Sequence, residues 1–480
     1  METTFISPNL WPALPEMFLL GMACVILVAD LFFSDKQRVF THWLSLGTLA
    51  GTVLILGAQI DNPDIVTFSG MYVADGMAIV LKLVACATTA AVLVYSRDYL
   101  KSRQLFQGEF YVLILGALLG AMVMISGLNF VSLYLGLELL SLSSYGLVAL
   151  RRDDGVASEA AMKYFVLGAI ASGLLLYGMS ILYGISGTLD VLELAAWASG
   201  AELSAGLLLA LVFVIIGMAF KLGAVPFHMW IPDVYEGAPT AVTLFLGTVP
   251  KLAAFALFMR LLVEGLGAMH SAWQAIIVAL ALLSMFIGSV VAIAQTSLKR
   301  MLAYSTISHV GFLLMGILAG TAQGYQAAMF YTITYVIMAA AGFGMILLLA
   351  RSGFEADKLD DFAGLNRRSP WFAAMMMFVM FGMAGVPPFV GFYAKFAVIW
   401  AALEAGFTWL AVAAVVLSVV SAFYYLRLVK IMYFDEPVDD AGELEVAADS
   451  RLVMSVNGLL ILGLGIFPGG LMAVCISAIS

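Results

Sequence analysis

The chain has 480 residues, of which 63% are hydrophobic and only 11% are charged, and its mean hydropathy is +1.05. Soluble domains average about 45–50% apolar and about 25% charged residues, so this composition excludes a soluble enzyme and a disulfide-rich secreted protein. The formal net charge of −9 argues against a nucleic-acid-binding protein, which needs a basic surface.

Runs of about 20 mostly apolar residues, the length that a membrane-spanning helix needs, recur fourteen times along the chain. The first seven are Leu14–Phe33, His42–Ile60, Ala74–Ser96, Phe110–Ser126, Asn129–Leu150, Ala160–Ile185 and Ser204–Tyr235. The next seven are Ala238–Glu264, Ala272–Ala294, Arg300–Ala319, Gly324–Arg351, Trp371–Leu403, Phe407–Phe434 and Leu452–Ile476. They predict an all-α polytopic membrane protein with about 14 transmembrane helices. The first run lacks a basic flank and a cleavage site, so we expect a span and not a signal peptide.

The lysines and arginines are distributed unevenly among the loops. Loops after even-numbered spans and both termini contain none, apart from Arg260 near the end of the eighth span. Because cytoplasmic loops carry an excess of Lys and Arg, we expect the odd-numbered loops in the cytoplasm and both termini in the periplasm. The loops after odd-numbered spans, with the adjoining helix ends, contain Lys36, Arg38, Arg97, Lys101, Arg103, Arg151, Arg152, Lys299, Arg300, Arg351, Lys358, Arg367, Arg368, Arg427, Lys430 and Arg451.

Several charged residues fall inside the predicted spans, where a charge at the helix centre costs about 2.5–3.5 kcal/mol on insertion scales. The four that lie mid-span are Glu138, Lys221, Lys251 and Lys395. We interpret them as an ion or proton path, with buried structural ion pairs as the alternative. A lysine that alternates between paired and unpaired states can take up and release a proton. Lys82 and Lys163 lie nearer to helix ends, where lysine reaches the membrane surface, and both roles stay open for them.

Two long spans contain prolines, which remove a helical hydrogen bond and disrupt the helix. The seventh span contains Pro226 and the twelfth contains Pro387 and Pro388, in the similar motifs Gly-Ala-Val-Pro-Phe and Gly-Val-Pro-Pro-Phe. An offset of five spans reverses the direction across the membrane, so the motifs indicate two inverted repeats. We therefore predict four parts: 1–109 with the first three helices, 110–265 and 272–435 as the two repeats of five helices, and 451–480 with the last helix.

Two histidines complete the set of polar residues within spans. His309 lies mid-span near Ser305, Thr306 and Ser308, and His228 follows the first proline motif by two residues. Imidazole titrates near neutral pH, so each histidine is a candidate proton carrier. A satisfied structural hydrogen-bond donor is the alternative for both.

No cofactor site is expected in this chain. The sequence has no glycine-rich phosphate loop after a strand. Cys24, Cys86 and Cys475 lie in apolar runs without the spacing of metal ligands, so we expect small buried residues. A metal site is also disfavoured because only one carboxylate lies deep within a span.

The stretch FKLGAVPFHMWIPDVYEGAP at 220–239, followed by TAVTLFLGTVPKLA, resembles the signature of the antiporter-like membrane subunits of respiratory complex I, the bacterial NADH–quinone oxidoreductase. The Val-Tyr-Glu-Gly-Ala-Pro segment is closest to the subunit N branch. The resemblance extends over the chain length, the fourteen spans, the two broken helices and the charge positions. The chain ends directly after its last span, as subunits N and M do, whereas subunit L continues with a lateral helix.

The resemblance implies a role for each charged position. Glu138 and Lys221 would form the Glu–Lys pair of the family, with Lys251 as the central relay and Lys395 as the exit-side site. Lys163 matches a lysine near the input side. The motif also contains Asp233 and Glu236, for which a structural capping role is equally open.

The resemblance also implies a setting for the chain. NADH, FMN, iron–sulfur clusters and quinone would act in other subunits, and this chain would couple quinone reduction to proton translocation. Its neighbours would be the antiporter-like subunit M and small membrane subunits, through which it meets the peripheral redox arm. The location would be the bacterial cell inner membrane.

Three other functions compete with this one. A subunit of an Mrp-type Na⁺/H⁺ antiporter would share the fold and the lysine-bearing broken helices. A structural spacer is disfavoured because it could carry leucine in place of the mid-membrane charges. An enzyme that acts on lipid or quinone lacks a nucleophile–base or metal constellation in this sequence.

Overall fold

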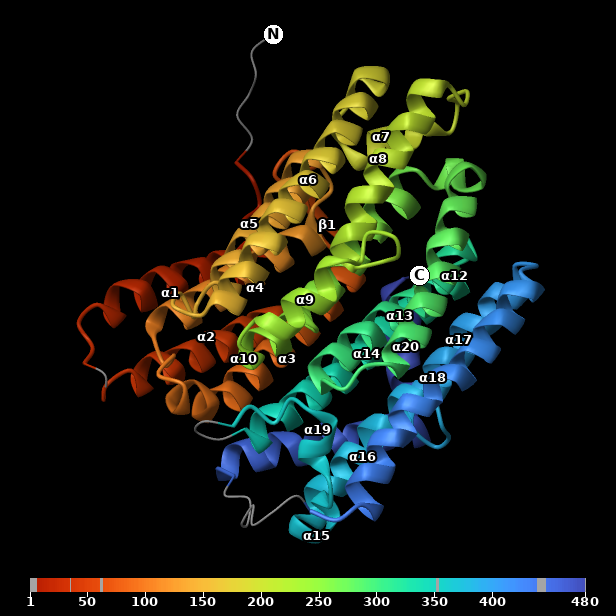
Figure 1. Ribbon diagram of the computed structural model, residues 1–480. Helices are drawn as coiled ribbons and strands as arrows, with labels where there is room; N and C mark the ends of the chain where they lie inside the picture. The colour runs from red at the N-terminus through yellow and green to blue at the C-terminus, as the bar shows by residue number, and fades with distance from the viewer. Residues whose placement is uncertain (1–6, 35, 61–63, 351–353, 438–445, 480) are drawn as a thin grey trace.

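The computed structural model describes residues 7–34, 36–60, 64–350, 354–437 and 446–479 (Figure 1). The N-terminal part contains α1 (Leu14–Asp30), α2 (Val39–Gly57), β1 (Ile65–Thr67), β2 (Tyr72–Ala74) and α3 (Gly76–Ser102). It is followed by α4 (Gly108–Ser126), α5 (Phe130–Val148), α6 (Gly155–Ser186), α7 (Val191–Ala198), α8 (Ala205–Leu222), α9 (Trp230–Gly237), α10 (Thr240–Leu246) and α11 (Val249–Phe258). The C-terminal part contains α12 (His270–Ile293), α13 (Leu298–Leu318), α14 (Ala322–Leu349), α15 (Leu365–Arg368), α16 (Pro370–Ala384), α17 (Val390–Glu404), α18 (Thr408–Phe434), α19 (Ala448–Ile466) and α20 (Gly469–Ala478).

The number of membrane crossings agrees with the sequence. In the described part of the chain, 13 helical stretches are long and apolar enough to span a membrane. The twelfth predicted span is not among them because it is divided into α16 and α17, which have 15 residues each. With this divided span the total is fourteen, and the predicted all-α polytopic fold is confirmed.

Two details of the fold differ from the expectation. The segment between the second and third spans contains a small antiparallel hairpin, in which Ile65 pairs with Ala74 and Thr67 with Tyr72. Strands of three residues are too short to give a periodic signal in the sequence. The eighth span is also interrupted, because α10 ends at Leu246 before α11 begins, and α11 continues into a π-helical segment at Met259–Gly265.

The two predicted repeats, 110–265 and 272–435, have similar close contacts between their first two helices. α4 packs along α5, and α12 packs along α13. A Cβ atom on Gly120 would meet the backbone nitrogen of Leu140, and one on Gly288 would meet that of Ser308. Glycine therefore allows the backbones to approach closely, as is typical of helix packing in membranes.

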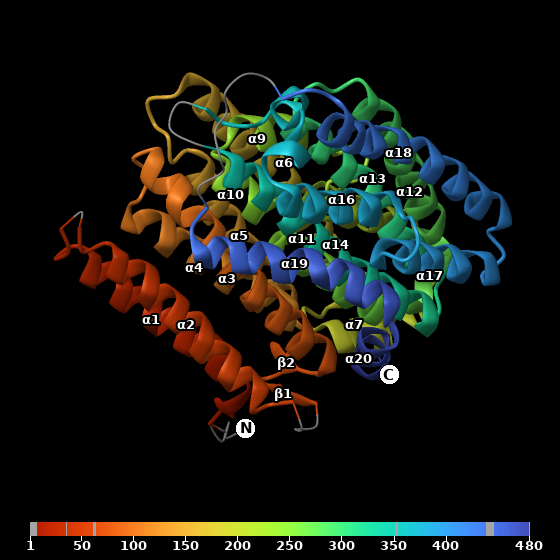
Figure 2. The same ribbon diagram turned by 90° about the horizontal axis from the view of Figure 1, so that it is seen from below.

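The loops separate into two ends of the bundle. At one end, the Tyr72 hydroxyl donates to the Pro12 carbonyl (3.0 Å), and Gly76 packs against Ala478. The first and last described helices therefore share an end, as an even number of crossings requires. This end also carries the hairpin, α7 and α20 (Figure 2).

The opposite end holds the basic loops predicted to be cytoplasmic. Arg97 pairs with Asp449 (2.7 Å), and Arg103 pairs with Glu355 (2.8 Å). Arg351 belongs to the same predicted set but lies outside the described residues. The segments after the third, eleventh and thirteenth spans thus meet at this end, as the charge pattern predicts.

The centre of the bundle is formed by α10, α11, α13 and α14, whose side chains are nearly all buried. α6, α12, α18 and α19 expose much of their surface instead. Figure 2 shows α19 running across the bundle between α3 and α16, and it packs against both. Lys251 on α11 and Lys299 on α13 are therefore enclosed by protein, whereas Lys163 on α6 lies near the surface.

Candidate functional site

The first break lies at the C-terminus of α8. This helix ends at Leu222, and Gly223 follows with φ +88°, a left-handed conformation that glycine adopts without strain. In a continuous helix the Leu222 carbonyl would accept a hydrogen bond from residue 226, but that residue is proline and has no N–H. Lys251 Nζ takes the place of this donor, at 2.9 Å from the Leu222 oxygen. The ammonium group thus lies at the negative end of the α8 dipole.

The second break repeats this arrangement at the C-terminus of α16. The helix ends at Ala384, Gly385 has φ +83°, and the missing helical donor for the Ala384 carbonyl is Pro388. Lys395 Nζ donates to the Ala384 oxygen at 3.0 Å and to Ser418 Oγ at 3.0 Å. In both breaks, a buried lysine satisfies the carbonyl that a proline leaves without a partner.

Lys221 and Glu138 each form a hydrogen bond with a serine of a neighbouring helix. Lys221 is buried on α8, and its Nζ donates to Ser141 Oγ on α5 at 2.8 Å. Glu138, one turn earlier on α5 and half-buried, accepts a hydrogen bond from Ser172 on α6. The two side chains make no direct ion pair in this structure. A small pocket is lined by Ser141, Ser172 and Lys221, and Glu138 contacts its wall through Ser172.

Lys163 lies apart from these buried groups. Its side chain is 44% exposed and pairs with Glu159 (2.9 Å) and Asp233 (2.8 Å). Asp233 also accepts from Arg300, which pairs in turn with Glu236 at 2.6 Å. Lys163 thus belongs to a partly exposed ion network at the α6–α9 interface.

The two candidate histidines have different surroundings. His309 is buried on α13, with the Tyr331 hydroxyl 2.6 Å from Nδ1 and the Tyr425 hydroxyl 3.1 Å from Nε2. His228 is half-buried beside the exposed Pro226, and its Nδ1 has no hydrogen-bond partner within the described residues. Only His309 is therefore part of a buried polar network.

Two further ionic clusters connect helices at the end of the bundle that is predicted to face the periplasm. Lys82 pairs with Glu16 (2.6 Å) and donates to the Tyr72 hydroxyl (2.8 Å). Arg260 makes two hydrogen bonds to Asp75, at 2.7 and 2.9 Å. These groups join α1, α3 and the π-helical segment after α11, so the contacts of Lys82 are those of a structural ion pair.

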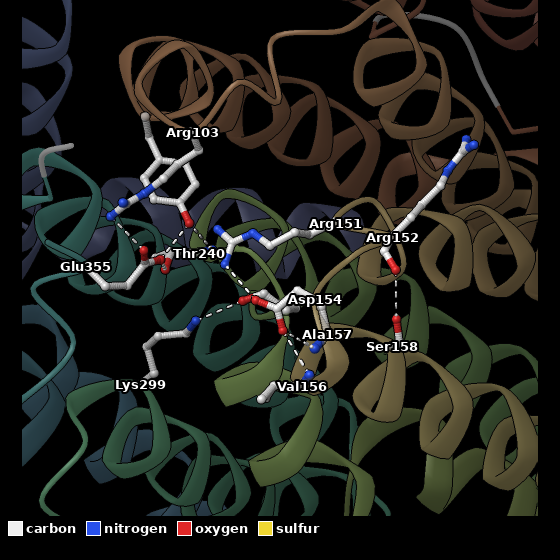
Figure 3. Close-up of polar contacts among 12 residues, drawn as sticks. Arg103, Arg151, Arg152, Asp154, Val156, Ala157, Ser158, Thr240, Lys299 and Glu355 are labelled. Atoms are coloured by element: carbon white, nitrogen blue, oxygen red, sulfur yellow. Dashed lines mark hydrogen bonds and ion pairs between the residues drawn. The ribbon is translucent and has the colours of Figure 1, made fainter. Parts of the chain in front are cut away.

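The opposite end contains the polar cluster shown in Figure 3. The Glu355 carboxylate accepts from Tyr99 (2.6 Å) and Thr240 (2.8 Å) and pairs with Arg103. Burial alone would raise the pKa of Glu355, but the Tyr99 hydroxyl and the nearby cations hold the pKa below its ordinary value. Lys299 donates to the Ala238 carbonyl at 2.8 Å beside this cluster.

Sequence reasoning did not find the serines and tyrosines that contact the charged groups. Ser141, Ser172 and Ser418 are spaced like any small residue of a membrane helix, and their contacts come from other helices. Within the described residues, no group of three or more His, Cys, Asp or Glu side chains could hold a metal ion.

The sequence comparisons identify the family. The family model described as "NADH:quinone oxidoreductase/Mrp antiporter, TM" matches residues 127–421. An NADH-quinone oxidoreductase subunit N from Thioalkalivibrio sulfidiphilus is 60% identical over 479 residues, which are 99% of this chain and 100% of the relative. This chain belongs to the subunit N family of NADH–quinone oxidoreductases. It is therefore a membrane subunit of respiratory complex I, an enzyme complex.

The structural comparisons agree with this family. A chain of respiratory complex I from Thermus thermophilus with bound aureothin is similar, with a TM-score of 0.83 and 30% identity, covering 96% of this chain and 98% of that one. A chain of the Mrp complex from a Dietzia species has a TM-score of 0.85 at 21% identity, covering 98% and 96%. The second likeness shows the shared fold alone, and the sequence relatives favour complex I over the Mrp alternative.

Proposed function

We propose that this subunit translocates protons through the buried groups Glu138, Lys221, Lys251, His309 and Lys395. The observation that carries the proposal is the pair of lysine–carbonyl contacts at the breaks, Lys251 with Leu222 and Lys395 with Ala384. A protonated lysine binds the free carbonyl, and a lysine that has lost its proton binds it less strongly. Proton transfer and the local structure of the break are thereby coupled.

The remaining candidates take peripheral places in this proposal. Lys163, paired with Asp233 at the helix surface, would lie at the entry, and His228 beside Pro226 would contact water or a neighbouring subunit at the first break. Moving one charge against a potential of 100 mV costs about 2.3 kcal/mol. That energy comes from quinone reduction in other subunits, where we place NADH, FMN, the iron–sulfur clusters and the quinone.

The proposed setting is the bacterial inner membrane, beside subunit M and small membrane subunits that connect to the peripheral redox arm. The basic end of the bundle, with Arg97 and Arg103, would face the cytoplasm and both termini the periplasm. A reporter fused after Ser480 is expected to be active only if it functions in the periplasm. Activity of a cytoplasm-only reporter at this position would contradict the orientation.

The experiment that tests the proposed function replaces Glu138 by Gln in the intact complex. The change removes the charge and keeps the shape, so we expect normal assembly, a strong loss of proton translocation and a parallel loss of NADH:quinone turnover. NADH oxidation by an artificial acceptor should persist, and Glu138→Asp should retain part of the activity. The matched control is Glu404→Gln, at an exposed position near the end of α17. Full coupled activity of Glu138→Gln would remove this carboxylate from the path.

A further inference from the structure

A line of hydrogen-bonded side chains extends to both sides of His309, within the predicted second repeat. The Tyr425 hydroxyl from α18 lies 3.1 Å from His309 Nε2 and 2.5 Å from Ser305 Oγ on α13. His309, Ser305 and Tyr425 are each at most 4% exposed. Three helices, α13, α14 and α18, thus contribute to one continuous line of hydrogen bonds from Ser305 to Tyr331.

The chemistry of these groups allows every hydrogen bond along the line to exchange its donor and its acceptor. A neutral imidazole donates at one nitrogen and accepts at the other, and each hydroxyl both donates and accepts. The line can therefore point toward Tyr331 or toward Ser305 with all hydrogen bonds kept. Such a line passes a proton when each member gives one proton and takes another.

The neighbouring hydroxyl of Tyr335 provides a contrast. Its ring also packs on His309, with centroids 5.2 Å apart, but its hydroxyl donates to Thr306 (2.8 Å). Thr306 donates in turn to the Leu302 carbonyl at 2.8 Å. This branch ends on a backbone oxygen that has no proton to give. The hydrogen bonds of the branch therefore keep one direction and cannot pass a proton onward.

The line also lies between two charged regions. Ser305 is four residues, or about 6 Å of helix rise, closer than His309 to the end of α13 that carries Lys299 and Arg300. In the other direction, Lys395 Nζ lies 4.9 Å from the ring centroid of Phe312, one turn after His309. The hydroxyls therefore lie on the way from the basic end of the bundle to the second break.

We propose that Tyr425 transfers protons between Ser305 and His309, on a branch that connects the basic end of the bundle with Lys395. In each transfer, Tyr425 gives its hydroxyl proton to His309 Nε2 and takes the Ser305 proton, while Ser305 is reprotonated from water at the basic end. The imidazolium then gives its Nδ1 proton to the Tyr331 oxygen, while Tyr331 gives its own hydroxyl proton through water to Lys395, which accepts it as a neutral amine. One proton thus enters at Ser305 and one is held on Lys395. This branch rests on the proposed translocating function.

The test is the Tyr425→Phe variant of the intact complex in proteoliposomes, with proton translocation and NADH:quinone turnover measured in H₂O and D₂O. We expect proton translocation to fall about 100-fold, the lower range for loss of a positioned proton-transfer group, with an increased solvent isotope effect. Ser305→Ala should reproduce both changes. The matched control is Tyr335→Phe, which removes an equally buried hydroxyl next to His309 but outside the line, and it should pump like the parent complex.

Three results would overturn the inference. Tyr425→Phe could pump at the parent rate, or Tyr335→Phe could lose activity to the same extent, which would indicate a packing effect. An unchanged isotope effect in an assembled but slow Tyr425→Phe complex would also assign a structural role. The Glu138→Gln variant separates this failure from that of the proposed function. If Glu138→Gln stops pumping while Tyr425→Phe does not, only the Tyr425 branch fails.

Discussion

The two helix breaks have the same backbone arrangement but obtain their lysine from different helices. At the first break the ammonium comes from Lys251 on α11, the next span, whereas at the second it comes from Lys395 on α17, directly after the break. Lys221 precedes Gly223 by two residues, and the corresponding position before Gly385 is Met383. The contact between ammonium and carbonyl is thus common to both breaks, while the position of the lysine in the sequence is not.

Both breaks share one physical requirement, which is a hydrogen-bond donor for the carbonyl that a proline leaves without a partner. A proline at 226 or 388 removes one N–H and leaves one carbonyl in the membrane without a donor, and such a group costs several kcal/mol in lipid. A lysine from any nearby helix can satisfy it. The first repeat adds Lys221 and the serines beside Glu138, and the second adds His309 and its tyrosines.

The largest loss of proton translocation is expected when the hydrogen-bond donors that are missing at the breaks are restored. Pro387→Ala with Pro388→Ala supplies an N–H for the Ala384 carbonyl, so the helix can continue and Lys395 loses its partner. We expect an inserted subunit with strongly reduced proton-to-electron stoichiometry, measured in proteoliposomes. Pro226→Ala should have the same effect at the first break. An unchanged stoichiometry in the double variant would remove the break from the mechanism.

A smaller effect is expected from a methyl group at the second break. Gly385→Ala forces alanine into φ +83°, at a cost of about 1–2 kcal/mol, and places the new Cβ 2.9 Å from Lys395 Cδ. Gly406→Ala is the matched control, because its φ is +89° and nothing lies within 4 Å of the added Cβ. Both variants should lower the thermal stability, but only Gly385→Ala should slow pumping. Equal pumping rates would show that displacement of Lys395 has no consequence.

The smallest effect, a change in thermal stability, is expected from replacing Glu355 at the basic end, where the two predicted repeats meet. Glu355 joins Thr240 of the first repeat to the loop after α14, and its pKa is held below the ordinary value. Its stabilising contribution is therefore fully present above the unfolded pKa of about 4.3 and is lost as the pH falls through the lower folded pKa. Glu355→Gln should lower the melting temperature at pH 7 and have a smaller effect near pH 4. A pH-independent difference would contradict this assignment.

Most of the fold could be predicted from the sequence because the membrane imposes a simple length rule. Apolar runs, the alternation of basic loops and the proline motifs of 223–227 and 385–389 are visible along the chain. The hairpin at Ile65–Ala74 and the interruption between α10 and α11 could not be found, since short elements are set by contacts with distant segments.

The candidate site was predictable by residue type but not by contact. Mid-span charges such as Lys251 and Lys395 are visible because each is costly in lipid. Their carbonyl partners are backbone atoms, and Ser141, the residue of α5 that Lys221 contacts, is one of many serines in the spans. The family resemblance implied a Glu138–Lys221 pair, whereas the structure has Ser141 and Ser172 in contact with these side chains.

The central claim is that the lysines at the breaks release their protons and do not only hold the carbonyls. Lys251→Arg and Lys395→Arg test it most directly, because arginine keeps the charge and the hydrogen-bond donors but does not deprotonate in proteins. The measurement is proton translocation per electron in proteoliposomes containing each assembled complex. The account predicts normal assembly with a proton-to-electron ratio well below that of the parent complex in both variants. A parent-like ratio in both would contradict it, because the lysines would then be structural caps alone.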